Sequence, residues 1–250
     1  MSLTTRNPPR VKPRAALHQV KALIDLVIFD CDGVLVDSEI LAAQVTCQTL
    51  DAIGLTMSVE DTISSLVGLD AMAARRKLET IHGVPLPVDF EARLAERLDH
   101  AFNTQLKPIA GIAELLRGLD QPYCVASNSG RERLRCTFAA TGLAPLVEGR
   151  VFSADDVARG KPAPDLFLYA AKTMGGVPPE RCLVIEDSVT GVTAARAAGM
   201  RVIGFCGGGH ILPGHDQRLL SLGADRIMTD HYQLAALPWL VTGVSAVVSA

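Results

Sequence analysis

The sequence lacks several features that would place it at once in a specialised class of protein. Its six cysteines have no metal-site spacing, and most fall in segments that we expect to be buried, which favours a reduced chain in the cytoplasm. No internal repeat or low-complexity segment is present. Because 48% of the 250 residues are hydrophobic and 20% are charged, the composition argues against disorder and allows one large domain or a domain with a smaller insert.

A strong excess of one charge is also absent. The net charge is -3, and the first 24 residues contain five basic residues and no acidic residue. The remaining residues carry 19 basic and 27 acidic side chains, and such an acidic body argues against nucleic-acid binding. The basic start has no apolar core of the kind that a secretory signal needs, and it resembles a transit peptide only weakly, so we expect a disordered leader.

Long apolar runs are lacking too. Residues 234–250 carry no charge, but Pro238 and Gly243 interrupt them, and a membrane helix needs roughly 20 apolar residues. We therefore expect no membrane association and predict that this tail packs against the core or a partner.

Short apolar segments, in contrast, recur along the chain and predict buried parallel strands. They cover residues 23–29, 123–127, 151–153, 182–185, 202–205 and 226–228. Helical patterns lie between them, at residues 112–119, 131–141, 164–174 and 189–198. This alternation predicts an α/β fold, a doubly wound parallel sheet with catalytic groups at the carboxyl ends of its strands.

Residues 40–106 break the alternation, because they contain helical patterns at 42–53, 71–81 and 90–102 without a clear strand. We predict an inserted helical cap domain whose two connections to the core lie close together and hinge over the site. The predicted divisions are a leader at 1–21, a core at 22–38 and 107–232, a cap at 39–106 and an apolar tail at 233–250.

Polar side chains follow four of the predicted strands. Asp30 and Asp32 come first, and side chains two residues apart in an extended chain point the same way. Four carboxylates that converge with a single ammonium at one sheet edge repel one another too strongly without a bound cation, and all-oxygen ligands predict Mg²⁺. The groups that follow the other strands are Ser127, Lys161, Glu186 and Asp187.

These residue types suit phosphoryl transfer. Asp30 would be the nucleophile that forms an aspartyl-phosphate, and Asp32 would be the general acid and then the general base. Ser127 would hold phosphate oxygens, and Lys161 would neutralise charge on the transferring group. Each residue alone is equally well a turn, a helix cap or a surface charge, so only the four clusters in order carry the prediction.

Four segments together resemble the motifs of the haloacid dehalogenase-like hydrolase superfamily, and the helical insert resembles the cap of its β-phosphoglucomutase-like branch. The resemblance implies a Rossmann-like core, with Mg²⁺ bound by Asp30, the backbone carbonyl of Asp32, and Asp187. Glu186 would bind the ion directly or lie just behind its ligands. Further substrate contacts are predicted at Gly33, Glu39 and Asn128. The motif segments are residues 30–39, 127–129, 160–165 and 186–191.

Within this superfamily Asp32 argues against two reactions. Dehalogenation has no use for an acid at this position, and phosphonate cleavage relies on an alanine there and on a cap lysine. Related mutases carry Gly-x-Ser-Arg in the cap, where the arginine binds a second phosphate, whereas this chain has Gly68-Leu69-Asp70-Ala71. Three basic residues that follow could substitute for it, Arg75, Arg76 and Lys77, although a solvated helix face is the preferred interpretation.

We therefore predict a cytoplasmic phosphatase, monomeric or weakly dimeric, whose partner is a small-molecule phosphate ester, a phosphorylated sugar or sugar acid. A phosphosugar mutase and a catalytically silent binding protein on the same fold are the alternatives. We expect His210 and His215, which lie in glycine-rich surroundings, to belong to a flexible surface loop.

Overall fold

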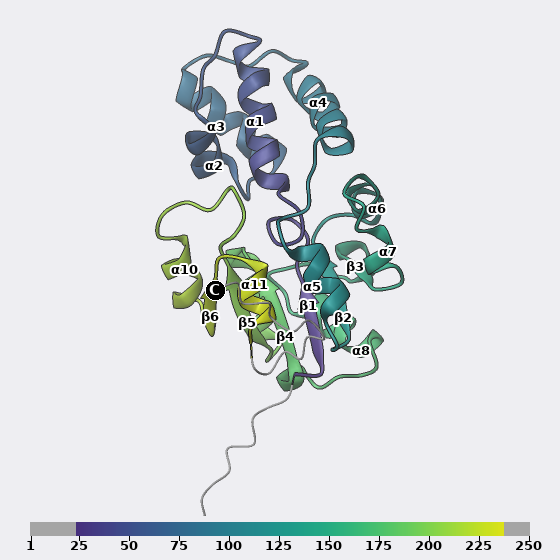
Figure 1. Cartoon of the computed structure of the whole chain (residues 1–250). Helices are drawn as coiled ribbons and strands as arrows, with labels where there is room; N and C mark the ends of the chain where they lie inside the picture. Colours follow the sequence, from purple (N-terminus) through teal and green to yellow (C-terminus); the bar gives the residue numbers. More distant parts are fainter. Residues whose placement is uncertain (1–23, 238–250) are drawn as a thin grey trace, which may run out of the picture.

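A six-stranded parallel sheet forms the centre of the computed structural model, which describes residues 24–237 (Figure 1). The strands lie in the order β3-β2-β1-β4-β5-β6, and every pairing is parallel. The predicted α/β fold is therefore confirmed. The strands are β1 (Leu26–Phe29), β2 (Tyr123–Ser127), β3 (Val151–Ser153), β4 (Cys182–Glu186), β5 (Arg201–Phe205) and β6 (Arg226–Met228).

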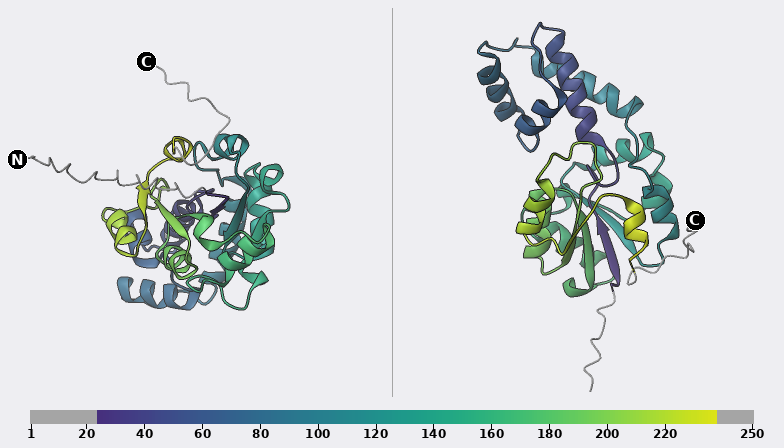
Figure 2. Two further views of the ribbon diagram at one scale, coloured as in Figure 1. Left: turned by 90° about the horizontal axis from the view of Figure 1, so that it is seen from below. Right: turned by 60° about the vertical axis from the view of Figure 1, so that its left-hand side comes forward.

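Helices cover both faces of the sheet, which explains why its strands are apolar on both sides (Figure 2). Val27 and Phe29 of β1 belong to one core cluster, and Leu26 and Ile28 belong to the other, because successive side chains point to opposite faces. The first face is packed by α5 (Ile112–Gly118), α6 (Arg131–Ala140), α7 (Ala144–Val147) and α11 (His231–Ala235). The second is packed by α8 (Asp165–Thr173), α9 (Val189–Ala197) and α10 (His215–Ser221).

Four helices separate β1 from α5 and stand together beyond one end of the sheet (Figure 1). They enclose a small core of their own, formed by Leu50, Leu78, Leu86 and Phe90. We refer to α1–α4 as the helical insert. Its helices are α1 (Ser38–Asp51), α2 (Val59–Leu66), α3 (Ala71–His82) and α4 (Phe90–Thr104).

The two connections between the insert and the sheet run side by side. The Asp37 amide donates to the Lys107 carbonyl at 3.2 Å, and the Ile109 amide donates to the Leu35 carbonyl at 2.9 Å. The predicted proximity of these connections is therefore observed, whereas the predicted hinge and the domain boundaries stay predictions.

Local capping explains where the shorter helices of the insert begin. The Ser58 hydroxyl accepts a hydrogen bond from the Asp61 amide at 3.0 Å and starts α2, a helix that the sequence analysis missed. Asp70 caps α3 in the same way, accepting from the Ala73 amide at 2.8 Å. Asp70, at the serine position of the mutase segment, thus has a structural function, and Ala71 stands at the arginine position.

The described chain ends just after α11. Leu234 and Leu237 are buried in the first core cluster, so the start of the predicted tail packs on the sheet. The predicted leader and residues 238–250 of the predicted tail lie outside the described residues. Between residues 24 and 237, no helix combines the length and the apolar character needed to cross a membrane.

Candidate active site

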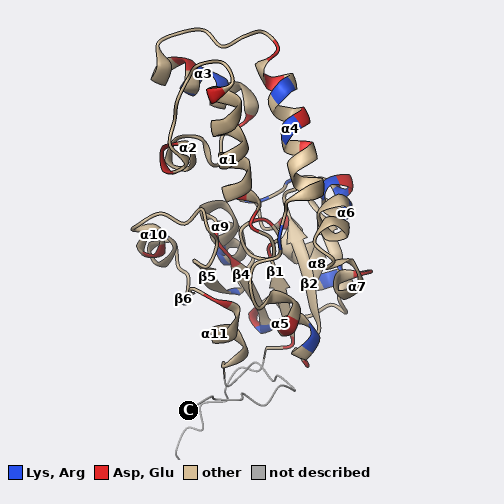
Figure 3. Cartoon of the chain, turned by 45° about the horizontal axis from the view of Figure 1, so that its top comes forward, with Lys and Arg blue, Asp and Glu red and all other residues tan. Residues whose placement is uncertain are grey.

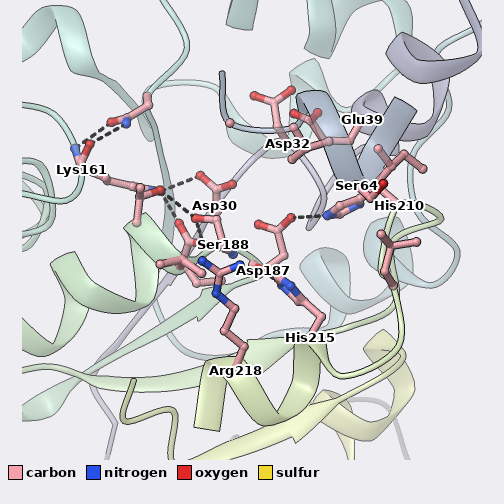
Figure 4. A pocket seen from close by; sticks show the side chains of 18 of the residues that line it. Asp30, Asp32, Glu39, Ser64, Lys161, Asp187, Ser188, His210, His215 and Arg218 are labelled. Atoms are coloured by element: carbon pink, nitrogen blue, oxygen red, sulfur yellow. Dashed lines mark hydrogen bonds and ion pairs between the residues drawn. The ribbon is translucent and has the colours of Figure 1, made fainter. Parts of the chain in front are cut away.

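Three buried carboxylates meet at the carboxyl ends of β1 and β4. The two strands are neighbours with Phe29 opposite Ile185, and the Asp30 amide donates to the Ile185 carbonyl at 2.9 Å. This register brings Asp30 against Glu186 and Asp187, so that one oxygen from each lies within 4.8 Å of the others (Figure 4). Their exposed fractions are 7%, 0% and 4%.

Lys161 is the cation of this cluster. Its Nζ lies 2.6 Å from Asp30 Oδ1 and 2.7 Å from Glu186 Oε1, and it sits 4.7 Å from the centre of the Phe167 ring. Burial lowers the pKa of the ammonium, but the attraction of Asp30 and Glu186 outweighs it and raises the pKa. Lys161 is therefore a charged donor at the bottom of the site.

Asn128 lies at the edge of the site, and its side-chain amide holds the backbone of Lys161. Its Nδ2 donates to the Lys161 carbonyl at 2.9 Å, and its Oδ1 accepts from the Lys161 amide at 2.8 Å. Both polar groups of the Asn128 side chain are thus hydrogen-bonded. Asn128, which was predicted to contact substrate, therefore helps to position Lys161.

The cluster has the properties of a divalent-cation site. Burial raises the pKa of Asp30, against the opposing effect of Lys161, and Glu186 and Asp187 raise it further. Burial and the repulsion of Glu186 raise the pKa of Asp187. Asp187 Oδ1 is buried and has no hydrogen-bond partner among the described residues. A hard cation would satisfy this oxygen and relieve the repulsion, so the residues fit Mg²⁺.

Both oxygens of Glu186 already accept hydrogen bonds from the protein. Oε1 accepts from Lys161, and Oε2 accepts from the amide and the hydroxyl of Ser188 at 2.8 and 2.9 Å. A Cβ at Gly191 would lie 1.7 Å from Oε1, so only glycine leaves room for this carboxylate. The arrangement favours Glu186 as a neighbour of the metal ligands over Glu186 as a direct ligand.

Asp32 lies near the cluster but bonds elsewhere. Ser38 at the start of α1 donates to Oδ1 at 2.6 Å, Ser129 donates to Oδ2 at 2.8 Å, and the Arg133 guanidinium lies 3.6 Å from Oδ1. The structure therefore brings together three of the four carboxylates predicted to converge. The fourth is held at the beginning of the insert, and Figure 3 shows acidic segments where α1 meets the sheet.

Ser127, Gly33 and Glu39 surround this arrangement. Ser127 ends β2, is buried, and accepts from the Ser129 amide at 3.0 Å. Gly33 has φ of 79°, and a Cβ there would lie 1.9 Å from Asp187 Oδ2, so glycine makes the close approach possible. Burial raises the pKa of Glu39, as does the nearby Asp32.

A cavity of about 840 Å³ lies between the insert and the end of the sheet, which is a suitable size for a small organic ligand. Asp30, Asp32 and Lys161 line it on the sheet side. The insert contributes Glu39 from α1, Ile63 and Ser64 from α2, and Val67 and Gly68 from the residues that follow α2. Arg75 is not among the lining residues, because its guanidinium binds Glu79 and Glu91 within the insert.

The expectation that His210 and His215 belong to a flexible surface loop is wrong. His210 is only 6% exposed, and its Nε2 lies 3.0 Å from Asp187 Oδ2. His215 Nε2 lies 2.6 Å from the carbonyl oxygen of Asp187. Burial lowers the pKa of His210, opposed by Glu39 and Asp37. The available signal was positional, since these residues follow β5 at the same sheet edge as the motifs.

Ser188, Thr190 and Arg218 also line the cavity without having been predicted to bind substrate. Arg218 forms no hydrogen bond or ion pair through its guanidinium with any residue of the described range, and it faces the cavity beside Ser188 in Figure 4.

Comparison with known proteins agrees with this geometry. A family model described as haloacid dehalogenase-like hydrolase matches residues 24–199, which contain all four motifs. A 6-phosphogluconate phosphatase of Escherichia coli (strain K12) is 32% identical over 192 residues, covering 76% of this chain and 86% of that protein.

Two crystal structures share both sequence and fold with the chain. A haloacid dehalogenase-like protein of unknown function from Agrobacterium tumefaciens is 40% identical, with a TM-score of 0.77. The match covers 84% of this chain and 96% of that protein. A HAD family hydrolase from Deinococcus radiodurans with bound phosphate and sodium is 37% identical, with a TM-score of 0.78 and coverage of 85% and 94%.

Proposed function

Because this chain belongs to the haloacid dehalogenase-like hydrolase family, we propose that it is a Mg²⁺-dependent phosphatase that hydrolyses a small phosphorylated sugar or sugar acid. One observation carries the proposal: Lys161 and the buried carboxylates of Asp30, Glu186 and Asp187 meet at the bottom of a cavity of about 840 Å³.

In the first step an oxygen of Asp30 would attack phosphorus, while the bond from phosphorus to the leaving oxygen breaks. Asp32 would donate a proton to that oxygen, and an aspartyl-phosphate would form on Asp30. Lys161 would stabilise the charge on the phosphoryl oxygens, and Ser127 would orient them. Asp30, the Asp32 carbonyl and Asp187 would hold Mg²⁺, which supplies charge neutralisation for the phosphoryl group.

In the second step Asp32 would take a proton from water, and the water oxygen would attack phosphorus. The bond between phosphorus and Asp30 would break, which releases inorganic phosphate and restores the carboxylate. The hydrogen bonds from Ser38 and Ser129 support this function, because they hold the Asp32 carboxyl group in a fixed orientation.

The lining of the cavity favours hydrolysis over phosphosugar isomerisation. The residues that the insert contributes to the cavity include no cation that would hold a second phosphate; they are Glu39, Ile63, Ser64, Val67 and Gly68. Asp70 caps α3, and Arg75 is bound to Glu79 and Glu91. On the sheet side, Arg218 is suited to a carboxylate, and the E. coli relative is named for a phosphorylated sugar acid.

The test is phosphate release by the purified full-length chain from a panel of phosphorylated sugars, sugar acids and nucleotides, with Mg²⁺ or with EDTA. We expect turnover that requires Mg²⁺, that Asp30→Asn abolishes, and that Asp51→Asn, an exposed control in α1, leaves unchanged. Absence of turnover across the panel would overturn the proposal. Conversion of β-glucose 1-phosphate to the 6-phosphate without phosphate release would support the mutase instead.

A further inference from the structure

The loop between β5 and α10, residues 206–214, reaches across the sheet edge to Asp187. Within it, the imidazole of His210 is buried, and its Nε2 lies 3.0 Å from Asp187 Oδ2 (Figure 4). An ionised carboxylate only accepts hydrogen bonds, so Nε2 carries the proton and donates it to this oxygen. His210 therefore fixes one of the two oxygens of Asp187.

The other oxygen of Asp187 is left for a cation. Oδ1 is buried and has no hydrogen-bond partner within residues 24–237. Asp187 also belongs, with Asp30 and Glu186, to the cluster of carboxylates that could hold a metal ion. We propose that His210 is a positioning residue that holds the Asp187 carboxylate through Oδ2 so that Oδ1 is presented to the divalent cation. This inference rests on the proposed metal-dependent function.

Steric features around the pair show that the contact is built into the fold. A Cβ at Gly33 would lie 1.9 Å from Asp187 Oδ2 and 2.8 Å from His210 Cε1. A Cβ at Gly208 would lie 2.8 Å from His210 Nδ1. Two glycines from distant parts of the chain thus clear the space in which the imidazole meets the carboxylate.

Hydrogen bonds also fix the backbone of the loop on both sides of His210. The Gly209 amide donates to Asp37 Oδ1 at 2.9 Å, and the Ile211 amide donates to the Gly208 carbonyl at 3.2 Å. His215, beyond the loop, holds the main chain of Asp187 through its carbonyl oxygen at 2.6 Å. Residue 187 is therefore fixed at both its backbone and its side chain.

Packing alone does not account for a histidine at this position. His210 Nδ1 is buried without a hydrogen-bond partner among the described residues, which is unfavourable for a polar atom. An apolar side chain would fill the same space without this penalty. The bond from Nε2 to Asp187 is the interaction that only a donor at this place can make.

The test compares variants that keep or lose the donor, with Mg²⁺ binding measured by isothermal titration calorimetry in the absence of substrate. Gln places its amide nitrogen near the position of Nε2, whereas Asn and Phe do not. We expect His210→Phe and His210→Asn to weaken Mg²⁺ binding about tenfold or more, the usual effect of losing a group that orients a metal ligand. His210→Gln should restore most of the affinity.

Two controls separate positioning from folding. His100→Phe, on the exposed face of α4, should leave the affinity unchanged. The thermal midpoint without metal should stay close to wild type in His210→Asn, which adds no volume and serves if His210→Phe does not fold. At saturating Mg²⁺ the KM for substrate should also stay near the wild-type value.

The Mg²⁺ affinities of the wild type and the variants distinguish this inference from the proposed function. Folded His210→Asn or His210→Phe protein with wild-type Mg²⁺ affinity would overturn the inference and leave the proposed function standing. A wild-type protein that binds no Mg²⁺ would overturn both. Equal weakening by Gln, Asn and Phe would show that the ring itself matters and not its donor, which also overturns the inference.

Discussion

The ammonium of Lys161 lies 2.6 Å from the carboxylate of Asp30, although 131 residues separate them in the chain. Both side chains are buried, and Asn128 fixes the Lys161 backbone from the neighbouring loop. This pair joins the proposed nucleophile to the cation that we propose neutralises the transferring group, and it depends on the order of strands β3, β2 and β1.

Replacing Lys161 with Met should damage both activity and stability. Loss of the donor should lower kcat by about 10²–10³. Because Asp30 and Glu186 lose their buried partner, the free energy of unfolding without metal should fall by about 3–5 kcal/mol. Urea denaturation with and without Mg²⁺ measures this, and Mg²⁺ should restore part of the loss. Lys172→Met, on the exposed side of α8, is the control, and equal effects in both variants would contradict the prediction.

Asp32→Asn should remove the proton transfers while leaving the cation cluster in place. We expect kcat on sugar phosphates to fall by about 10²–10⁴, the range of general acid–base catalysis. An aryl phosphate such as p-nitrophenyl phosphate needs little protonation of its leaving group. Its first turnover should therefore be less affected than later ones, and a rapid-mixing burst of nitrophenol should be seen. Steady-state activity within a factor of about two of wild type would count against Asp32 as acid and base.

Gly33→Ala tests the steric relation to Asp187, and Gly54→Ala is a matched control. Both glycines have positive φ, 79° and 77°, but a Cβ at Gly54 would meet nothing within 4 Å. Each variant should lose about 1 kcal/mol of unfolding free energy because of its backbone conformation. Only Gly33→Ala should also lose Mg²⁺ binding and activity. Similar Mg²⁺ affinity in the two variants would show that Asp187 tolerates the added methyl group.

Stability should depend on pH through His231. Burial lowers the pKa of this histidine to about 4, from 6.5, and it lies stacked on Phe205 with Nε2 2.9 Å from the Val34 carbonyl. Because the unfolded chain binds the proton more readily, the stabilisation is complete above pH 6.5 and is lost as the pH falls toward about 4. Over this range it amounts to about 3 kcal/mol.

Urea denaturation from pH 7 to pH 4 checks this, with His231→Gln beside the wild type. Raised pKa values at Asp30 and Asp187 act in the opposite direction and are common to both proteins, so the difference between the two curves isolates His231. The difference should shrink toward acid pH, and His100→Gln should follow the wild type. Parallel curves for wild type and His231→Gln would refute this assignment.

Arg218→Gln should separate acidic from neutral substrates. If the guanidinium binds a carboxylate, kcat/KM for 6-phosphogluconate should fall about tenfold, the value of one charged hydrogen bond, while that for glucose 6-phosphate stays unchanged. Arg226→Gln, on the exposed start of β6, is the control. An equal loss for both substrates would instead place Arg218 near the phosphoryl group.

The sequence was informative where strands end in charged residues. Asp30, Lys161, Glu186 and Asp187 could be placed together in advance, because the carboxyl ends of parallel strands share one edge of the sheet. Helices with clear apolar periodicity, such as α6 and α8, were also located to within a residue or two. The short helices α2, α7, α10 and α11 were missed, because so few turns carry little periodic pattern.

Predictions about His210 failed for a related reason. A glycine-rich loop has no periodicity, and its contacts depend on where the neighbouring strands place it. Of the two glycines that make room for the imidazole, Gly208 belongs to the same loop, but Gly33 lies far away in the chain, so nothing in the local sequence joins Gly33 to His210.

By itself, the sequence determined the α/β class, the hydrolase family and the set of charged side chains at the sheet edge, because these follow from short patterns along the chain. Only the tertiary structure decided how those side chains share their bonds. It engaged both oxygens of Glu186, turned Asp32 toward Ser38 and Ser129, and buried His210 against Asp187. Hydrogen-bond geometry and steric room depend on residues that meet only after folding, which is why no pattern in the chain contains them.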